Sequence, residues 1–197
     1  MNSNTPDHFT LADLMKAMKD DQSGLRPVEK WHPEYCGEID IVIKSDGSWW
    51  HEGTRVTRKG LIGLFASILR KDEDGETYLV TPVEKMLITV ERAHFVAIRV
   101  DVKGEGEKTR LFFTTNMEET IEAGPDLPLR VETDPDTLEP MPFVNIRGRL
   151  EASLARPVFY ELVEHAVEID TPEGPQLGVY ASGTFFPLGP VGAHLLT

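Results

Sequence analysis

The chain has 197 residues, 40% of them apolar and 27% charged, which is the ordinary balance of a globular protein. Its 33 acidic residues outnumber its 20 lysines and arginines, so its net charge is −13. That charge argues against nucleic acid and anionic membranes as partners, because both are bound through clustered cations. The single cysteine, Cys36, excludes a disulfide framework, and no apolar run approaches the roughly 20 residues of a membrane span, which favours a cytoplasmic location.

The first elements along the chain are a short helix and a hairpin. Residues 10–19 have the pattern of an amphipathic helix capped by Thr10, which either covers a sheet or contacts a partner. Residues 39–43 and 49–51 read as two strands. The Asp46-Gly47 turn between them predicts a β-hairpin, because Asp-Gly readily adopts the positive φ angles of a tight turn.

A strand–helix–strand pattern occurs twice. Apolar residues at helical spacing predict a helix within residues 57–70, and a fainter copy predicts a second helix within residues 155–166. Pro157 suits the first turn of that second helix, where its missing N–H is not needed. Each helix is preceded by a strand and followed, after an acidic turn that contains glycine, by another strand. We interpret the pattern as a duplicated unit.

The remaining segments predict mainly antiparallel strands. Strands are expected at residues 78–81, 86–90, 95–102 and 109–114. Residues 124–142 are rich in proline and acid and are expected to form a loop region in which only residues 127–131 are strand-like. Residues 182–190 are expected to be irregular, with Phe185 and Phe186 against the edge of a core. The predicted fold class is α+β, with an N-terminal lobe of residues 1–83 and a C-terminal lobe of residues 84–197.

Signatures of catalysis and metal binding are absent from the sequence pattern. The six histidines lack the paired spacing of metal ligands, and no Gly-x-Ser-x-Gly motif is present. Gly104-Glu105-Gly106 is not a phosphate loop, because it lies between two strands and its glutamate would repel phosphate. No catalytic residue, metal site or cofactor is therefore predicted, and an enzyme is the least favoured class.

Two groups of cations lie near the starts of the predicted helices. Arg58 and Lys59 precede and enter the first helix, while Arg147, Arg149 and Arg156 lie ahead of the second. Cations at the positive end of a helix dipole are unfavourable by roughly 0.3–1 kcal/mol each. Either they pair with acidic side chains, or they form a site for phosphate or carboxylate together with the helix N–H groups.

Two further segments have residues whose role is either structural or ligand-binding. Glu84 and Lys85 form either an exposed ion pair at a turn or the rim of a ligand site. Trp49 and Trp50 are neighbours on a strand and so face opposite sides. Both could belong to a hairpin core, or one could be exposed and stack on a flat ring.

The sequence also resembles a bacterial family catalogued as domain of unknown function 1285. The resemblance extends from Trp31 over most of the chain, and its motifs are not catalytic signatures. It is carried by residues 36–40, 46–49, 64–70, 74–75, 79–85, 115–116, 129–131, 158–162 and 178–186. It implies a duplicated two-domain α+β fold, with a second domain similar to pleckstrin-homology-like folds. It further implies a ligand site at the domain interface for a nucleotide-like molecule, and a role in signalling.

These observations lead to two functional hypotheses. The first is a non-enzymatic ligand-binding or sensor protein that holds a small anionic molecule, nucleotide-like in the resembling family, between the repeats. Its expected ligand residues are the cations and flanking side chains named above: Arg58, Lys59, Arg147, Arg149, Arg156, Trp49, Trp50, Glu84 and Lys85. The alternative is an adaptor that binds a protein partner through the N-terminal helix or the Phe185-Phe186 segment, with no small-molecule ligand.

Overall fold

The computed structural model describes residues 26–172 and 174–192, and the helix expected over residues 10–19 lies outside them. Contacts divide the chain into two compact units. The N-terminal unit comprises the chain up to residue 42 together with residues 50–89, and the C-terminal unit comprises residues 43–49 together with the chain from residue 90. The contacts thus divide the chain near residue 90, while the sequence analysis places the lobe boundary after residue 83.

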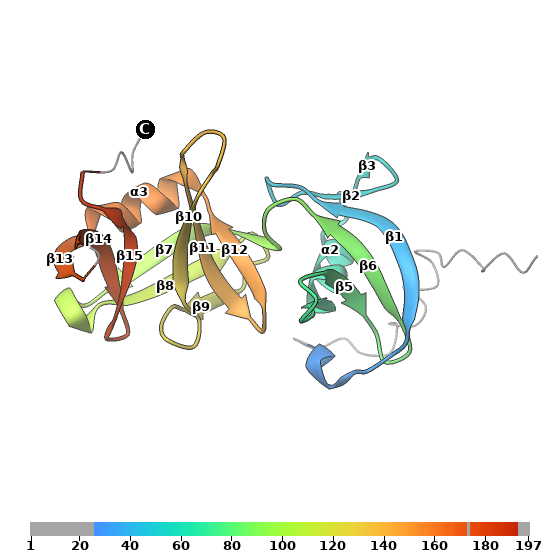
Figure 1. Cartoon of the computed structure of the whole chain (residues 1–197). Helices are drawn as coiled ribbons and strands as arrows, with labels where there is room; N and C mark the ends of the chain where they lie inside the picture. Colours follow the sequence, from blue (N-terminus) through green and yellow to red (C-terminus); the bar gives the residue numbers. More distant parts are fainter. Residues whose placement is uncertain (1–25, 173, 193–197) are drawn as a thin grey trace, which may run out of the picture. The chain divides into compact units, whose positions relative to one another are not determined.

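The described residues of the N-terminal unit form a curled six-stranded sheet with one α-helix (Figure 1). Its strands lie in the order β3-β2-β1-β6-β5-β4. In chain order its elements are the 3₁₀ turn η1 (Val28–Lys30), β1 (Tyr35–Ile43), β2 (Trp49–His51), β3 (Thr54–Arg55), α2 (Lys59–Ser67), β4 (Leu69–Lys71), β5 (Thr77–Val80) and β6 (Lys85–Val90).

The core of this unit forms between the sheet and α2. The buried positions Ile41 and Ile43 alternate along β1 with less buried neighbours, as expected for a strand with one apolar face. Helix α2 buries Phe65 on its inner face, and Leu79 of β5 is fully enclosed. Burial of each such large apolar side chain contributes on the order of 1.5–3 kcal/mol.

The C-terminal unit contains two sheets and the second α-helix. One sheet has the strand order β10-β11-β12-β7-β8-β9, and a smaller one has the order β13-β14-β15. In chain order the elements are β7 (Phe95–Lys103), the 3₁₀ turn η2 (Gly106–Lys108), β8 (Arg110–Thr115), β9 (Thr120–Glu122), β10 (Leu129–Thr133), β11 (Pro140–Arg147), β12 (Leu150–Leu154), α3 (Arg156–Glu164), β13 (Val167–Thr171), β14 (Gly174–Ala181) and β15 (Thr184–Pro190).

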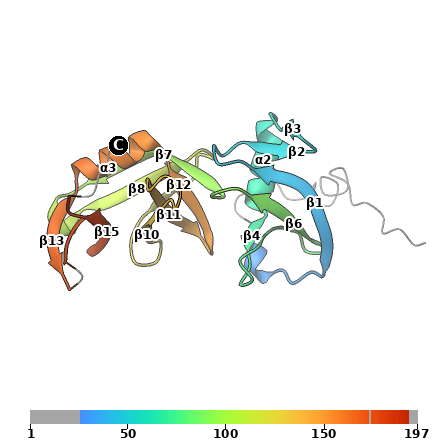
Figure 2. The same ribbon diagram turned by 45° about the horizontal axis from the view of Figure 1, so that its top comes forward.

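Strand β12 occupies the middle of the larger sheet. It pairs antiparallel with β11 and parallel with β7, and Phe143 of β11 lies directly opposite Ser153. A single residue, Ala155, separates the end of β12 from the start of α3. Helix α3 packs on β7, as Figure 2 shows. The smaller sheet is held to the larger one at Ser182, whose N–H donates to the carbonyl oxygen of Thr109 at 2.9 Å.

The duplicated order predicted from the sequence is confirmed, although the two copies use it differently. Each α-helix follows neighbouring strands and precedes two antiparallel strands, β4 and β5 after α2, and β13 and β14 after α3. In the first copy these later strands join the same sheet as β1, whereas in the second copy they form the smaller sheet with β15.

Two local expectations were wrong. Residues 184–190 form strand β15 rather than irregular structure, because Pro187 and Pro190 occupy an edge strand, where a missing N–H leaves no ladder bond unmade. Strand β10, by contrast, overlaps the strand-like residues 127–131 expected within the stretch 124–142. The first helix is also shorter than expected: α2 ends at Ser67, and Leu69 pairs with Leu79 as the start of β4.

The described residues are therefore mostly β, with two α-helices of nine residues each. The expected α+β class is met in this coarse sense. No helix in the described part of the chain is long and apolar enough to cross a membrane.

Gly178 provides a test of the close packing between β14 and β15. A Cβ atom at this position would lie 2.5 Å from the carbonyl oxygen of Phe186 and 2.4 Å from the ring of Phe185. We expect Gly178→Ala to destabilise the protein by about 1–3 kcal/mol, as overpacked cores do. The measurement is urea unfolding followed by circular dichroism.

The matched control is Gly63→Ala in the interior of α2, where a Cβ atom meets nothing within 4 Å. This variant is expected to gain up to about 1 kcal/mol, because alanine is the better helix former. Equal unfolding midpoints for the two variants would contradict the packing described here.

Candidate functional site

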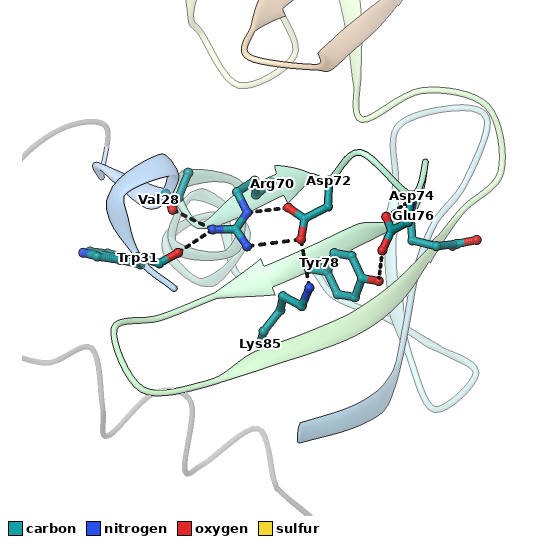
Figure 3. Close-up of polar contacts among 8 residues, drawn as sticks. All are labelled: Val28, Trp31, Arg70, Asp72, Asp74, Glu76, Tyr78 and Lys85. Atoms are coloured by element: carbon teal, nitrogen blue, oxygen red, sulfur yellow. Dashed lines mark hydrogen bonds and ion pairs between the residues drawn. The ribbon is translucent and has the colours of Figure 1, made fainter. Parts of the chain in front are cut away.

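The most extensive polar network around a buried charge in the N-terminal unit is centred on Arg70 (Figure 3). Arg70 lies on β4 and is only 8% exposed. Its Nη1 donates to the carbonyl oxygens of Val28 at 2.9 Å and Trp31 at 2.7 Å. Its Nε and Nη2 donate to the carboxylate of Asp72 at 2.5 and 3.2 Å. One guanidinium thus fastens the segment around η1 to the edge strand of the sheet.

Lys85 and Tyr78 complete the network. The Lys85 ammonium lies 2.9 Å from Asp72 Oδ2 and 4.1 Å from the centre of the Tyr78 ring. The Tyr78 hydroxyl donates to Asp74 at 2.8 Å. Asp72 therefore accepts charge-assisted bonds from two cations, which are among the stronger hydrogen bonds in proteins.

These contacts shift the pKa values of the acidic members. Burial alone would raise the pKa of Asp72, but the hydrogen bonds from Arg70 and Lys85 outweigh it and hold that pKa below its usual value. The bond to Asp74, together with burial, raises the pKa of Tyr78 to about 12. Because the cationic groups are already engaged, we interpret this network as a structural anchor rather than a ligand site.

The cations predicted near α2 lie at the surface. Arg58 is the N-cap of α2 and Lys59 its first residue, and both are exposed. Within the described residues neither side chain forms an ion pair, and the first turn of α2 contains no acidic residue. Glu84 lies half-buried in the turn before Lys85, where its N–H donates to the Thr81 hydroxyl at 3.0 Å.

The two tryptophans differ in their surroundings. Trp49 is 1% exposed and belongs to the core, which removes it from any role in stacking on a ligand. Trp50 is half-buried on β2, opposite Arg55 of β3. If either indole stacks on a flat ring, the geometry leaves that role to Trp50.

The three arginines predicted near the second helix do not form one cluster. Arg147 and Arg149 lie at the turn before β12, and Arg156 follows its end. Five residues of strand separate the turn from the helix, a distance of roughly 17 Å. Arg147 is paired with Glu119 and stacks over Phe95, with 5.1 Å between guanidinium carbon and ring centre.

Arg156 lines a cavity in the C-terminal unit with a volume of about 170 Å³. The cavity lies where β11, β12 and the start of α3 meet. Its apolar wall is formed mainly by Met141, Phe143, Leu154 and Phe159. Its polar groups are two guanidiniums, two carboxylates and one hydroxyl, from Arg92, Arg156, Asp134, Glu139 and Ser153.

The polar groups of the cavity have unused bonding capacity. Arg156 Nη2 donates to Glu139 Oε2 at 2.9 Å, in a pair that is exposed and so worth under about 1 kcal/mol. Arg92 makes no ion pair within residues 26–172 and 174–192, and its charge acts on Asp134 from a distance. Ser153, a residue only 8% exposed, adds a hydroxyl to the lining.

Asp134 is ionised and held in place by the backbone. Its Oδ1 accepts the N–H groups of Thr137 and Asp136, both at 2.9 Å, and these bonds hold the pKa of Asp134 below its usual value. The Thr137 side chain also hydrogen-bonds this carboxylate. The charged side chains of the cavity keep much of their exposure to solvent, so a polar ligand would replace water at their remaining donors and acceptors.

An ion pair behind the cavity fixes its aromatic wall. Arg130 of β10 stacks on Phe143 with 4.3 Å between guanidinium carbon and ring centre. It also forms a bidentate pair with Glu151, at 2.6 and 2.7 Å, and bonds to Glu132. Phe143 is therefore enclosed between strands rather than free to change its rotamer.

Sequence reasoning found Arg156 but missed its neighbours. Asp134 and Glu139 lie in the proline-rich loop region, to which no binding role was assigned. Arg92 is an isolated cation between two strands. The signal that could have located the two acids is the pair of strand-like segments on either side of them. Antiparallel pairing of two such strands brings the two ends of the intervening loop together. No group of three or more His, Cys, Asp or Glu suited to a metal ion occurs among the described residues.

Fold and site together define a duplicated, mostly β protein with one nine-residue helix in each unit and a small mixed-polarity cavity in the second. Residues 26–93 match the model of the N-terminal domain of the family DUF1285, a domain of unknown function. Residues 94–188 match the model of the C-terminal domain of the same family. The chain belongs to the DUF1285 family.

Two crystal structures are similar to this chain. A DUF1285 family protein from Silicibacter pomeroyi DSS-3 is 41% identical, with a TM-score of 0.84 over 90% of this chain and 95% of that one. A DUF1285 family protein from Shewanella baltica OS155 is 24% identical, with a TM-score of 0.48 over 64% of this chain and 91% of that one. Among curated proteins, none matches the chain.

Replacement of Arg70 tests the anchor. We expect Arg70→Met to destabilise the protein by about 3 kcal/mol, because it leaves Asp72 and the carbonyls of Val28 and Trp31 without their charged partner. Arg99→Met is the control, since Arg99 pairs with Asp101 at an exposed site and its loss should change stability by less than about 1 kcal/mol. Similar urea midpoints for the two variants would contradict the anchor.

Alkaline unfolding tests the Tyr78 bond. The pKa of Tyr78 is raised to about 12 from its usual value of 10.0, so its contribution to stability is complete below pH 10 and is lost as the pH rises towards 12. The melting temperature of the wild type should therefore fall more steeply over this range than that of Tyr78→Phe. Parallel curves for the two proteins would show that the Tyr78 pKa is not raised by folding.

Proposed function

We propose that the protein is a non-enzymatic ligand-binding or sensor protein whose C-terminal unit binds a small molecule with an anionic group. The observation that carries this proposal is the cavity of about 170 Å³ whose lining includes two guanidiniums, those of Arg92 and Arg156, together with the side chain of Ser153.

The lining of the cavity favours a carboxylate over a phosphate-rich ligand. Asp134 and Glu139 would repel a polyphosphate, whereas two guanidiniums can bind one carboxylate through several N–H groups. The volume of about 170 Å³ also suits a molecule no larger than one substituted ring. The proposal thus narrows the nucleotide-like ligand implied by the family resemblance to a small carboxylate.

No catalytic step is part of this proposal. The cavity presents no histidine, cysteine or lysine that could transfer a proton near neutral pH or act as a nucleophile, and its acids are paired or held by backbone N–H groups. We include in the proposal a cytoplasmic location and a role in signalling. A pleckstrin-homology-like arrangement of the C-terminal unit is likewise proposed, supported by its mainly antiparallel sheets and single α-helix.

The alternative remains an adaptor that binds a protein and no small molecule. In one surface expected to serve it, Phe186 is buried and Phe185 is half-buried, with 5.5 Å between the ring centres of Phe185 and Tyr180. The other expected surface, the helix over residues 10–19, lies outside the described residues. The absence of any carboxylate binding in the following experiment would favour this alternative.

Titration with simple carboxylates tests the proposed function. We expect 4-methylpentanoate, benzoate or phenylacetate at millimolar concentration to shift the backbone amide NMR signals of Ser153, Leu154 and Phe159, which line the cavity. Arg156→Met should weaken this response about tenfold or more, because it removes a guanidinium from the lining.

The control is Arg99→Met, which removes an arginine of similar side-chain exposure, 63% against 69% for Arg156, that does not line the cavity. It should leave the response unchanged. Signal shifts that are equal in the two variants, or no shifts with any of the three carboxylates, would be inconsistent with a carboxylate site in this cavity.

A further inference from the structure

The charges of the cavity balance one another. Its ionisable lining residues are two arginines and two acids, Arg92, Arg156, Asp134 and Glu139, so its formal charge is zero. A site selected only for an anion would be expected to carry excess positive charge, and this lining does not. Its two acids therefore require an explanation that the proposed function alone does not supply.

Each charged group has capacity left for a ligand. Arg156 uses one Nη atom for Glu139, which leaves its Nε and other Nη as donors. Glu139 uses one oxygen for Arg156, and Asp134 uses one oxygen for two backbone N–H groups. The second oxygen of Glu139 accepts no hydrogen bond from the described residues, and the Asp134 carboxylate, which also accepts a hydrogen bond from the Thr137 side chain, keeps lone pairs for one more donor. The lining can thus receive both a carboxylate and an ammonium group.

The rest of the cavity is apolar and small. Met141, Phe143, Leu154 and Phe159 supply its walls, and an apolar cavity of about 150 Å³ is known to hold a benzene-sized molecule. The volume of about 170 Å³ therefore accommodates a branched aliphatic or single-ring side chain. The Ser153 hydroxyl in the lining can form one more hydrogen bond to a polar atom of the ligand.

From this combination we infer that the ligand is a zwitterionic amino acid with an apolar side chain. Its α-carboxylate binds the guanidiniums of Arg92 and Arg156, and its α-ammonium binds the carboxylate oxygens of Asp134 and Glu139. Its side chain lies against Phe143 and Phe159. This inference rests on the proposed function, since it names the class of molecule held by the same cavity.

The amino group is what distinguishes this ligand from a simple carboxylate. A carboxylate without an amine leaves Asp134 and Glu139 facing an added negative charge, and their repulsion weakens binding. A zwitterion gives every charged group of the lining a partner of opposite sign. Because desolvated polar groups that remain unpaired are strongly unfavourable, the discrimination between the two molecules should be large.

The test compares three molecules that share one side chain. L-Leucine is the zwitterion, 4-methylpentanoate lacks its amine, and L-leucinamide lacks its carboxylate. We expect isothermal titration of the full chain to show L-leucine binding at least tenfold more tightly than either analogue. L-Phenylalanine and L-glutamate extend the comparison, and the acidic side chain of glutamate should prevent binding.

Variants of the two acids separate charge recognition from structure. In the double variant Asp134→Asn with Glu139→Gln, the Asn Oδ1 can still accept the N–H groups of Asp136 and Thr137, so the local turn is retained. This variant should bind L-leucine about tenfold more weakly and 4-methylpentanoate more tightly than the wild type. Opposite changes of this kind cannot arise from a general loss of folding.

The outcomes distinguish the two levels of the argument. Equal affinity for L-leucine and 4-methylpentanoate, with both lost in Arg156→Met, would overturn the amino-acid assignment and leave the carboxylate site in place. Tighter binding of L-leucinamide would overturn it as well. No binding of any of the three molecules would remove the proposed function together with the inference that depends on it.

Discussion

The pairing of β12 within the larger sheet is the constraint on which the C-terminal unit depends. This strand joins β11 on one side and β7 on the other, and its register places Ser153 opposite Phe143. A shift of one residue would exchange the two faces of the strand and move Ser153 away from the cavity. Because α3 begins directly after β12, the same register positions Arg156. One strand therefore aligns the hydroxyl, the aromatic wall and a guanidinium.

Charge pairing with carboxylates engages many of the arginines in the described strands of this acidic chain. A carboxylate lies within bonding distance of each of four strand arginines, Arg70, Arg110, Arg130 and Arg147. Most arginines in the described sheets therefore act as ion-pair partners of acidic side chains. The cavity departs from this rule in two ways. Arg92 has no ion pair among the described residues, and the pair between Arg156 and Glu139 is solvent-exposed and therefore easily exchanged for a ligand.

Sequence patterns predicted the repeated helices and most strands, because apolar periodicity directly reports burial of one face. They failed where tertiary context decides. The strand β15 contains Pro187 and Pro190, which argue against a strand until an edge position is known. The cavity was only partly predictable, since Arg92 and Asp134 are 42 residues apart and meet through the pairing of strands. Helical periodicity likewise could not reveal that Leu69 leaves the helix to pair with Leu79.

The two copies of the repeat also show why a cavity is found beside α3. The strands after α2 return to the sheet that the helix covers, and Phe65 and the fully buried Leu79 belong to that closed core. The strands after α3 leave the larger sheet and form a separate one with β15, so they do not cover the start of that helix in the same way. At that start the chain instead has Pro157 and the acidic turn containing Asp134 and Glu139. Divergence of strand pairing after duplication thus creates space in one copy, and the charged residues around that space determine what it can bind.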